Sequence, residues 1–127
     1  MPKKIVVIDN DPDFVEALVT VLDANGYETV SATDGDAAFA VIKEQRPDLV
    51  LLDVMMRSVS EGLDIASKLL DDSSLKNVPV VLITGIRKAD LLAESYRPGE
   101  GLANVRMTLE KPVKPDELIR AVKSIIG

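Results

Sequence analysis

Three short runs of apolar residues, at positions 5–8, 49–52 and 80–83, are the clearest pattern along the chain. Apolar runs of about four to eight residues with turn residues at both ends are typical of strands buried on both faces. Residues 27–32 and 105–109 alternate between apolar and polar side chains instead, which is typical of strands at the edge of a sheet. The pattern therefore predicts three central strands and two edge strands.

Apolar residues at helical spacing fill the segments that follow these strands. In the first segment Phe14 and Leu18 lie on one apolar face, Asp11 is placed to cap the helix, and Pro12 suits its first position. Gly26 is predicted to end that helix at its C-cap. Further helices are predicted around residues 37–42 after Asp34, around 63–70, weakly over 89–96, and from Pro115 to 126.

Strand and helix alternate five times in this reading, with no repeat and no linker. Such alternation predicts an α/β fold, in which right-handed crossovers build a doubly wound parallel sheet covered by helices on both faces. The strand order 2-1-3-4-5 places the two alternating strands at the edges. It also puts the switch point between the first and third strands, where a ligand crevice is expected outside the carboxyl ends.

Composition and charge exclude several classes of function. The chain of 127 residues has a formal net charge of −6 and no visible basic patch, which argues against a nucleic-acid partner. It contains no Cys and no His, which excludes disulfides, zinc–thiolate sites and Ser–His nucleophiles. No apolar run approaches the ~20 residues of a membrane span, and the start is too short for a signal peptide. We predict one cytoplasmic domain over residues 1–127.

Polar side chains follow the predicted strands at one edge of the sheet. Asp9 and Asn10 follow the first strand, Asp53 ends the third, and Thr84 and Lys111 come after the fourth and fifth. Clustered carboxylates favour a hard cation such as Mg²⁺, while a lysine and a hydroxyl suit the oxygens of a phosphoryl group. Asp53 is then a candidate nucleophile, although a metal ligand or a helix cap is an alternative role. Taken singly, each of these residues also fits an ordinary strand end, cap or solvated lysine.

These residues lie in four characteristic segments, at positions 5–12, 48–56, 79–85 and 110–115. Together the segments resemble a response regulator receiver domain of two-component signalling, over essentially the whole chain. The resemblance implies a flavodoxin-like receiver fold and a phosphorylatable switch rather than an enzyme, here as a single domain without an output domain. It also implies a sensor histidine kinase or a histidine phosphotransfer protein as partner.

The resemblance assigns roles residue by residue. Asp53 matches the phosphoacceptor, Thr84 matches the hydroxyl residue that binds the phosphoryl group, and Lys111 matches the lysine that pairs with it. The bond from Lys111 to Pro112 is expected to be cis, as in relatives. The positions that match the surroundings of Mg²⁺ are Asp9, Asn10, Asp53 and Met55, the last through its backbone carbonyl.

The chain also departs from the family pattern. Asn10 stands where relatives usually have a second acid, so we expect weaker Mg²⁺ binding. Thr108 stands where many relatives have the aromatic switch residue, the stretch from 84 to 111 is long around 97–101, and the loop 57–62 gains one residue. An alternative follows: a degenerate receiver that docks to a protein target without phosphorylation. The sequence decides neither the target nor whether the chain forms a homodimer.

Overall fold

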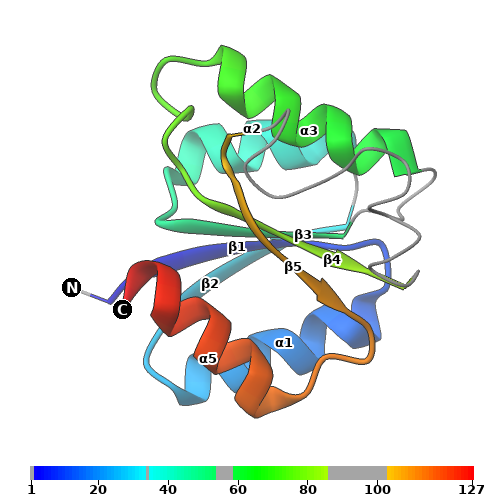
Figure 1. Cartoon of the computed structure of the whole chain (residues 1–127), viewed down its shortest axis with the longest axis vertical. Helices are drawn as coiled ribbons and strands as arrows, with labels where there is room; N and C mark the ends of the chain where they lie inside the picture. Colours follow the sequence, from blue (N-terminus) through cyan, green and yellow to red (C-terminus); the bar gives the residue numbers. More distant parts are fainter. Residues whose placement is uncertain (1, 34, 54–58, 86–102) are drawn as a thin grey trace.

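The computed structural model describes residues 2–33, 35–53, 59–85 and 103–127 (Figure 1). These ranges contain five strands and four helices, which alternate up to the fourth strand; the fifth strand is the next described element after it. None of the helices in these ranges is long and apolar enough to cross a membrane. The elements are β1 (Lys4–Ile8), α1 (Pro12–Ala24), β2 (Glu28–Ala32), α2 (Gly35–Gln45), β3 (Leu49–Asp53), α3 (Val59–Asp71), β4 (Val80–Thr84), β5 (Val105–Glu110) and α5 (Pro115–Ile126).

The five strands form one parallel sheet in the order β2-β1-β3-β4-β5, which confirms the predicted fold class and strand order. The central strands β3 and β4 are buried throughout, whereas β2 and β5 are partly exposed, as expected for edges. In the register of β1 and β3, Ile8 lies opposite Leu52. Asp9 and Asp53 therefore leave the sheet side by side at its carboxyl edge.

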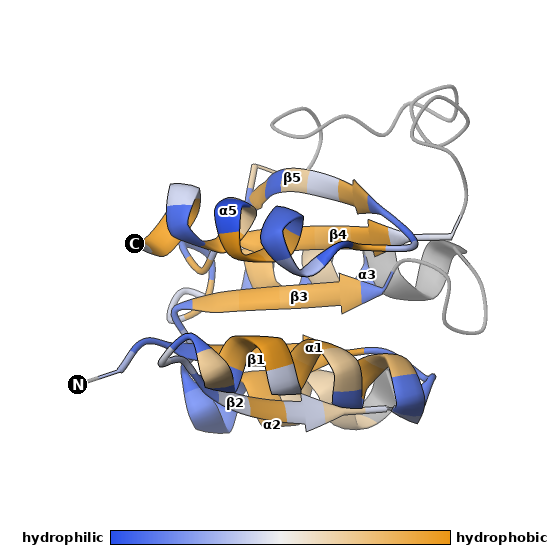
Figure 2. Ribbon diagram, turned by 90° about the horizontal axis from the view of Figure 1, so that it is seen from below, coloured by the Kyte–Doolittle hydropathy of each residue, from blue (hydrophilic) through white to orange (hydrophobic). Residues whose placement is uncertain are grey.

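Helices cover both faces of the sheet: α2 and α3 pack on one face, and α1 and α5 on the other (Figure 1). Because successive side chains of a strand point to opposite faces, each central strand contributes to both cores. Val6 and Val50 belong to the core under α2 and α3, and Val7 and Leu51 to the core under α1 and α5. The hydropathy colouring of Figure 2 shows the resulting apolar strands behind α1 and α5.

The predicted limits of α1 are confirmed. The Asp11 carboxylate accepts hydrogen bonds from the backbone N–H groups of Asp13 and Phe14, and Pro12 occupies the first helical position. At the other end Gly26 has φ of +88°, a left-handed conformation that glycine adopts without a steric penalty. The cap at Asp11 fixes where α1 starts, directly beside the end of β1.

Two predicted boundaries were wrong. The helix expected around 63–70 begins at Val59, so residues 59–62 belong to α3 and not to the preceding loop. Serine and glycine in this stretch have low helix propensity, so local preference did not predict this start. The first edge strand begins at Glu28, while Tyr27 is buried outside it. The predictions for Asp34, residues 89–96 and residues 97–101 fall outside the described part of the chain.

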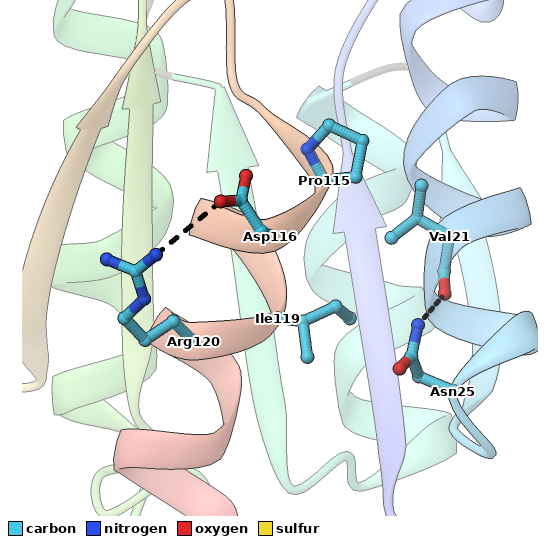
Figure 3. Close-up of a pocket in the computed structure, with 6 residues that line it drawn as sticks. All are labelled: Val21, Asn25, Pro115, Asp116, Ile119 and Arg120. Carbon is cyan, nitrogen blue, oxygen red and sulfur yellow. Dashed lines mark hydrogen bonds and ion pairs between the residues drawn. The ribbon is translucent and has the colours of Figure 1, made fainter.

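A shallow groove of about 390 Å³ lies between α1 and α5 (Figure 3). Ile119 points from α5 toward α1, and an ion pair of 3.5 Å joins Asp116 to Arg120 on the exposed side of α5. None of the groove residues is among the candidate site residues of the strand ends. The groove is lined by Val21, Asn25, Pro115, Asp116, Ile119 and Arg120.

Candidate functional site

Asp9 follows β1 directly and is only 1% exposed. Its backbone N–H donates to the Ala32 carbonyl at 3.2 Å, which continues the pairing with β2 by one residue. One carboxylate oxygen, Oδ1, accepts from the backbone N–H of Asp11 at 2.9 Å. The other, Oδ2, accepts from the Lys111 ammonium at 3.0 Å. Both oxygens of this buried carboxylate therefore have a donor, as burial of a charge requires.

Asp53 and Thr84 end the two neighbouring central strands. Asp53 is the last residue of β3 and is 2% exposed, and Thr84 is the last residue of β4 and is fully buried. In the register of these strands Asp53 lies opposite Ile83, so Thr84 extends one residue further toward the same edge. The sheet thus brings a carboxylate and a hydroxyl residue to adjacent strand ends.

Lys111 reaches this edge from the connection between β5 and α5. Its backbone N–H donates to the Thr84 carbonyl at 2.8 Å, which fixes the start of the side chain beside the end of β4. The following peptide bond, to Pro112, is cis, as the resemblance implied. From this anchor the Lys111 ammonium lies 3.0 Å from Asp9 Oδ2 and 3.8 Å from Asp53 Oδ1. One cation therefore contacts both buried carboxylates.

The electrostatics of this arrangement favour a further cation. Asp9, Asp53 and Lys111 together carry one negative charge in excess, in a place where the two carboxylates are almost without solvent. Buried charges are costly unless they are paired and hydrogen-bonded, so a second positive charge near the carboxylates is favoured. Oxygen donors are the ligands that Mg²⁺ prefers.

The residues fit Mg²⁺ in the type of their donor atoms. Asp9 and Asp53 supply carboxylate oxygens, and the exposed Asn10 supplies an amide next to Asp9. Asp11 is already engaged as the cap of α1, as we predicted. Across the described ranges, no group of three or more His, Cys, Asp or Glu side chains is placed to hold a metal ion. The donor set is thus suited to a hard cation but contains few charges.

Comparison with known proteins decides the family. A sequence model of the response regulator receiver domain matches residues 5–123. The polar-differentiation response regulator DivK of Brucella anthropi is 30% identical over 100% of this chain and 98% of DivK. The chain belongs to the response regulator receiver family. The DNA-binding response regulator MtrA of Mycolicibacterium smegmatis is 36% identical over 98% of this chain but only 50% of MtrA, so the receiver spans half of that relative.

The fold of the receiver agrees with that of a solved relative. The chemotaxis protein CheY4 of Vibrio cholerae superimposes with a TM-score of 0.85 at 23% sequence identity, over 98% of this chain and 99% of CheY4. Receivers are the signalling part of two-component response regulators and are not enzymes of the classical kind. Membership thus places the chain in phosphorylation-based signalling with histidine kinases or phosphotransfer proteins as the partner class.

The structure brings four of the predicted site residues, Asp9, Asp53, Thr84 and Lys111, to one edge of the sheet. Their roles in the receiver stay predictions, because proximity alone does not assign a role. Asn10 follows Asp9 on the exposed side of the same edge. Met55 lies outside the described residues.

Sequence reasoning missed one member of this edge. Phe14 was assigned only to the apolar face of α1, but its ring centroid lies 4.2 Å from the Lys111 ammonium. The position of Phe14 relative to the helix cap could have indicated this contact. Phe14 comes three residues after the cap Asp11, so it lies in the first turn of a helix that starts next to the strand ends.

Proposed function

We propose that the receiver accepts a phosphoryl group on Asp53 from a phosphohistidine of a sensor kinase or a histidine phosphotransfer protein. The observation that carries this proposal is the contact of the Lys111 ammonium with two buried carboxylates at the carboxyl edge of the sheet, at 3.0 Å from Asp9 and 3.8 Å from Asp53. A cation held there can neutralise charge on an incoming phosphoryl group. We further propose that residues 1–127 form one cytoplasmic receiver domain.

The proposed reaction is a single displacement at phosphorus. A carboxylate oxygen of Asp53 forms a bond to phosphorus as the bond from phosphorus to the donor's imidazole nitrogen breaks. The leaving nitrogen keeps the electron pair of the broken bond and takes a proton from solvent. The product is an aspartyl phosphate on the receiver and a free histidine on the donor. Later hydrolysis of the acyl phosphate would return Asp53 to its starting state.

The other residues of the edge support this reaction through charge and hydrogen bonds. In the proposal, Lys111 pairs with one phosphoryl oxygen, and the Thr84 hydroxyl donates to another. Asp9, Asn10, Asp53 and the carbonyl of Met55 would hold Mg²⁺, which supplies charge neutralisation of the phosphoryl oxygens when bound. The new charge on Asp53 would then change the loops that follow β3 and β4, which is how a switch is read.

Incubation with acetyl phosphate and Mg²⁺, followed by intact-protein mass spectrometry, tests the proposal. We expect one added phosphoryl group on the wild type and none on Asp53→Asn. A matched control is Asp64→Asn, which makes the same change at an exposed position on α3 and should leave the modification intact. A phosphorylated Asp53→Asn protein, or an unmodified wild type, would contradict the proposal.

A second function is favoured by one specific observation. Asn10 replaces a charged metal ligand, and the described residues hold no cluster of three acidic or other metal-binding side chains. A receiver with inefficient phosphorylation would then act as a docking module for a protein target. This alternative predicts that target binding does not change with acetyl phosphate or with Asp53→Asn. Sedimentation of the protein with and without acetyl phosphate would show whether either form is a homodimer.

A further inference from the structure

The Lys111 ammonium has a third neighbour besides the two carboxylates. The centroid of the Phe14 ring lies 4.2 Å from Nζ, well within the ~6 Å at which a ring face attracts a cation. The ammonium is thus held between Asp9 Oδ2, Asp53 Oδ1 and an aromatic face. Asp53 belongs to β3, Phe14 belongs to α1, and Asp9 lies in the connection between β1 and α1.

Hydrogen bonds at the start of α1 link the backbone of Phe14 to Asp9 through Asp11. The backbone N–H of Phe14 donates to the Asp11 carboxylate at 3.4 Å, and the backbone N–H of Asp11 donates to Asp9 Oδ1 at 2.9 Å. Asp9 and the ring therefore belong to one short hydrogen-bonded segment that runs from the end of β1 into α1. This segment presents both a carboxylate and an aromatic face to the same ammonium.

Packing alone gives no reason for an aromatic residue at this position. Phe14 is half-buried and packs against the core under α1 and α5, most of whose members are aliphatic. Phe39, the other phenylalanine of the chain, is also half-buried but packs from α2 on the opposite face of the sheet. Leu or Met would also fill a half-buried apolar position, whereas only an aromatic residue offers a ring face to the Lys111 ammonium.

We propose that Phe14 is a positioning residue for phosphoryl transfer, which acts by holding the Lys111 ammonium at the carboxyl edge of the sheet. This inference rests on the proposed function. A lysine side chain has several rotatable bonds, and without the ring more of its conformers point into solvent. Fewer molecules then have the ammonium in place when the phosphoryl group arrives. Tyr keeps the ring face, whereas Leu and Met keep only the apolar volume.

The test compares Phe14→Leu, Phe14→Met and Phe14→Tyr with the wild type and with Phe39→Leu. The rate constant for phosphorylation by acetyl phosphate at saturating Mg²⁺ is expected to fall about two- to fivefold in the Leu and Met variants, which is the range of one exposed cation–π contact. The Tyr variant should retain the wild-type rate constant. Phe39→Leu, the same truncation away from the cation, should lower stability without lowering the rate constant.

A spectroscopic measurement separates this inference from the proposed function. In NMR spectra the Lys111 Cε protons should show an upfield ring-current shift in the wild type and in Phe14→Tyr, and lose it in Phe14→Leu and Phe14→Met. If the wild type is phosphorylated but all Phe14 variants react equally fast, the inference fails and the proposed function stands. If the wild type is not phosphorylated, the proposed function fails, and the ring-current shifts alone then decide whether Phe14 holds the ammonium. A slowed Phe14→Tyr would also overturn the inference, since the ring face is retained.

Discussion

A lysine–aspartate ion pair lies at each end of the sheet, and the two pairs differ in their surroundings. At the carboxyl edge, the side chains of Lys111 and Asp9 are 26% and 2% exposed and lie 3.0 Å apart. At the opposite end, where α2 and α3 finish, the side chains of Lys43 and Asp72 are 61% and 14% exposed and lie 3.2 Å apart. The distances are similar, so burial is the main difference. We call the pair of Lys111 and Asp9 the buried pair, and the pair of Lys43 and Asp72, whose lysine is mostly in solvent, the exposed pair.

This difference indicates different roles for the two pairs. An exposed ion pair contributes little to stability, because water screens it and two side chains lose freedom. Burial of charge instead requires desolvation, which the attraction between the partners offsets only with good geometry. A buried pair is therefore poorly explained by stability alone. The buried pair of this receiver lies beside the candidate phosphoacceptor Asp53, whereas the exposed pair lies beside a turn.

The largest effect is expected from Lys111→Met. The change leaves Asp9 and Asp53 as buried carboxylates without their shared cation, which should lower the free energy of unfolding by about 2 kcal/mol at neutral pH, less than for a fully buried pair because Lys111 is partly exposed. Phosphorylation by acetyl phosphate should slow about a hundredfold, as expected for loss of a charge that stabilises the transition state. Urea unfolding and mass spectrometry measure the two effects.

Lys43→Met is the matched control for that variant. It removes the same charge from the exposed pair, and we expect unchanged phosphorylation and no resolvable change in the urea midpoint. If Lys43→Met were as destabilising as Lys111→Met, burial would not be the difference that separates the two ends of the sheet.

The next largest effect is expected from Asn10→Asp, which adds a carboxylate next to the buried pair. A pair of opposite charges ~4 Å apart is worth about 4 kcal/mol at an effective dielectric near 20, before the cost of desolvation is subtracted. Because desolvation offsets much of this energy, we expect Mg²⁺ to bind about tenfold more tightly to the variant. Because a bound ion stabilises the folded state by mass action, thermal shift against Mg²⁺ concentration reports the affinity. Asn77→Asp, in an exposed turn, adds the same charge elsewhere and should leave the affinity unchanged. Equal affinities in all three proteins would refute the role of Asn10.

Removal of the cap at the start of α1 should have a smaller effect. Asp11→Ala leaves the backbone N–H groups of Asp13 and Phe14 without their side-chain acceptor, which should lower the free energy of unfolding by about 1 kcal/mol. Asp11→Ser retains an acceptor and should recover most of the loss. Since the Asp11 N–H that donates to Asp9 belongs to the backbone, both variants should keep that hydrogen bond.

The smallest effect concerns the exposed pair in acid. Hydrogen bonds from the Ser74 hydroxyl and backbone N–H, and then the nearby Lys43, lower the pKa of Asp72 from 3.8 to about 2. The ionised form is therefore favoured by folding, so its contribution to stability is complete above about pH 4 and is lost as the pH falls toward 2. The melting temperatures of wild type and Asp72→Asn should differ above pH 4 and converge near pH 2. A difference that persists at pH 2 would contradict this assignment.

The fold was largely predictable because two patterns in the sequence have simple physical causes. Strands buried on both faces require continuous apolar runs, and residues 49–52 and 80–83 have them, while the alternation in 105–109 identified an edge. The start of α3 was missed because Ser60 and Gly62 disfavour a helix in isolation. Local propensity therefore did not predict where this helix begins.

The membership of the site was predictable, but its geometry was not. Strand ends told us that Asp9, Asp53 and Lys111 would share an edge. They did not tell us that the Lys111 ammonium would lie nearer to Asp9 than to Asp53, because a long side chain has many conformers and the choice depends on its neighbours. The contact with Phe14 was unpredictable for the same reason, since it depends on the conformation of the Lys111 side chain.

The hydrogen bond between Lys111 and Asp9 joins residues that are 102 positions apart in the chain. This separation along the sequence is large, and the contact cannot form until Lys111, which follows β5, has been synthesised. A nascent chain that ends at β3 already contains Asp53 but lacks the Lys111 ammonium that lies beside it in the folded protein. If Lys111 acts as we propose, competence for phosphoryl transfer would therefore appear only once synthesis has passed the last edge strand.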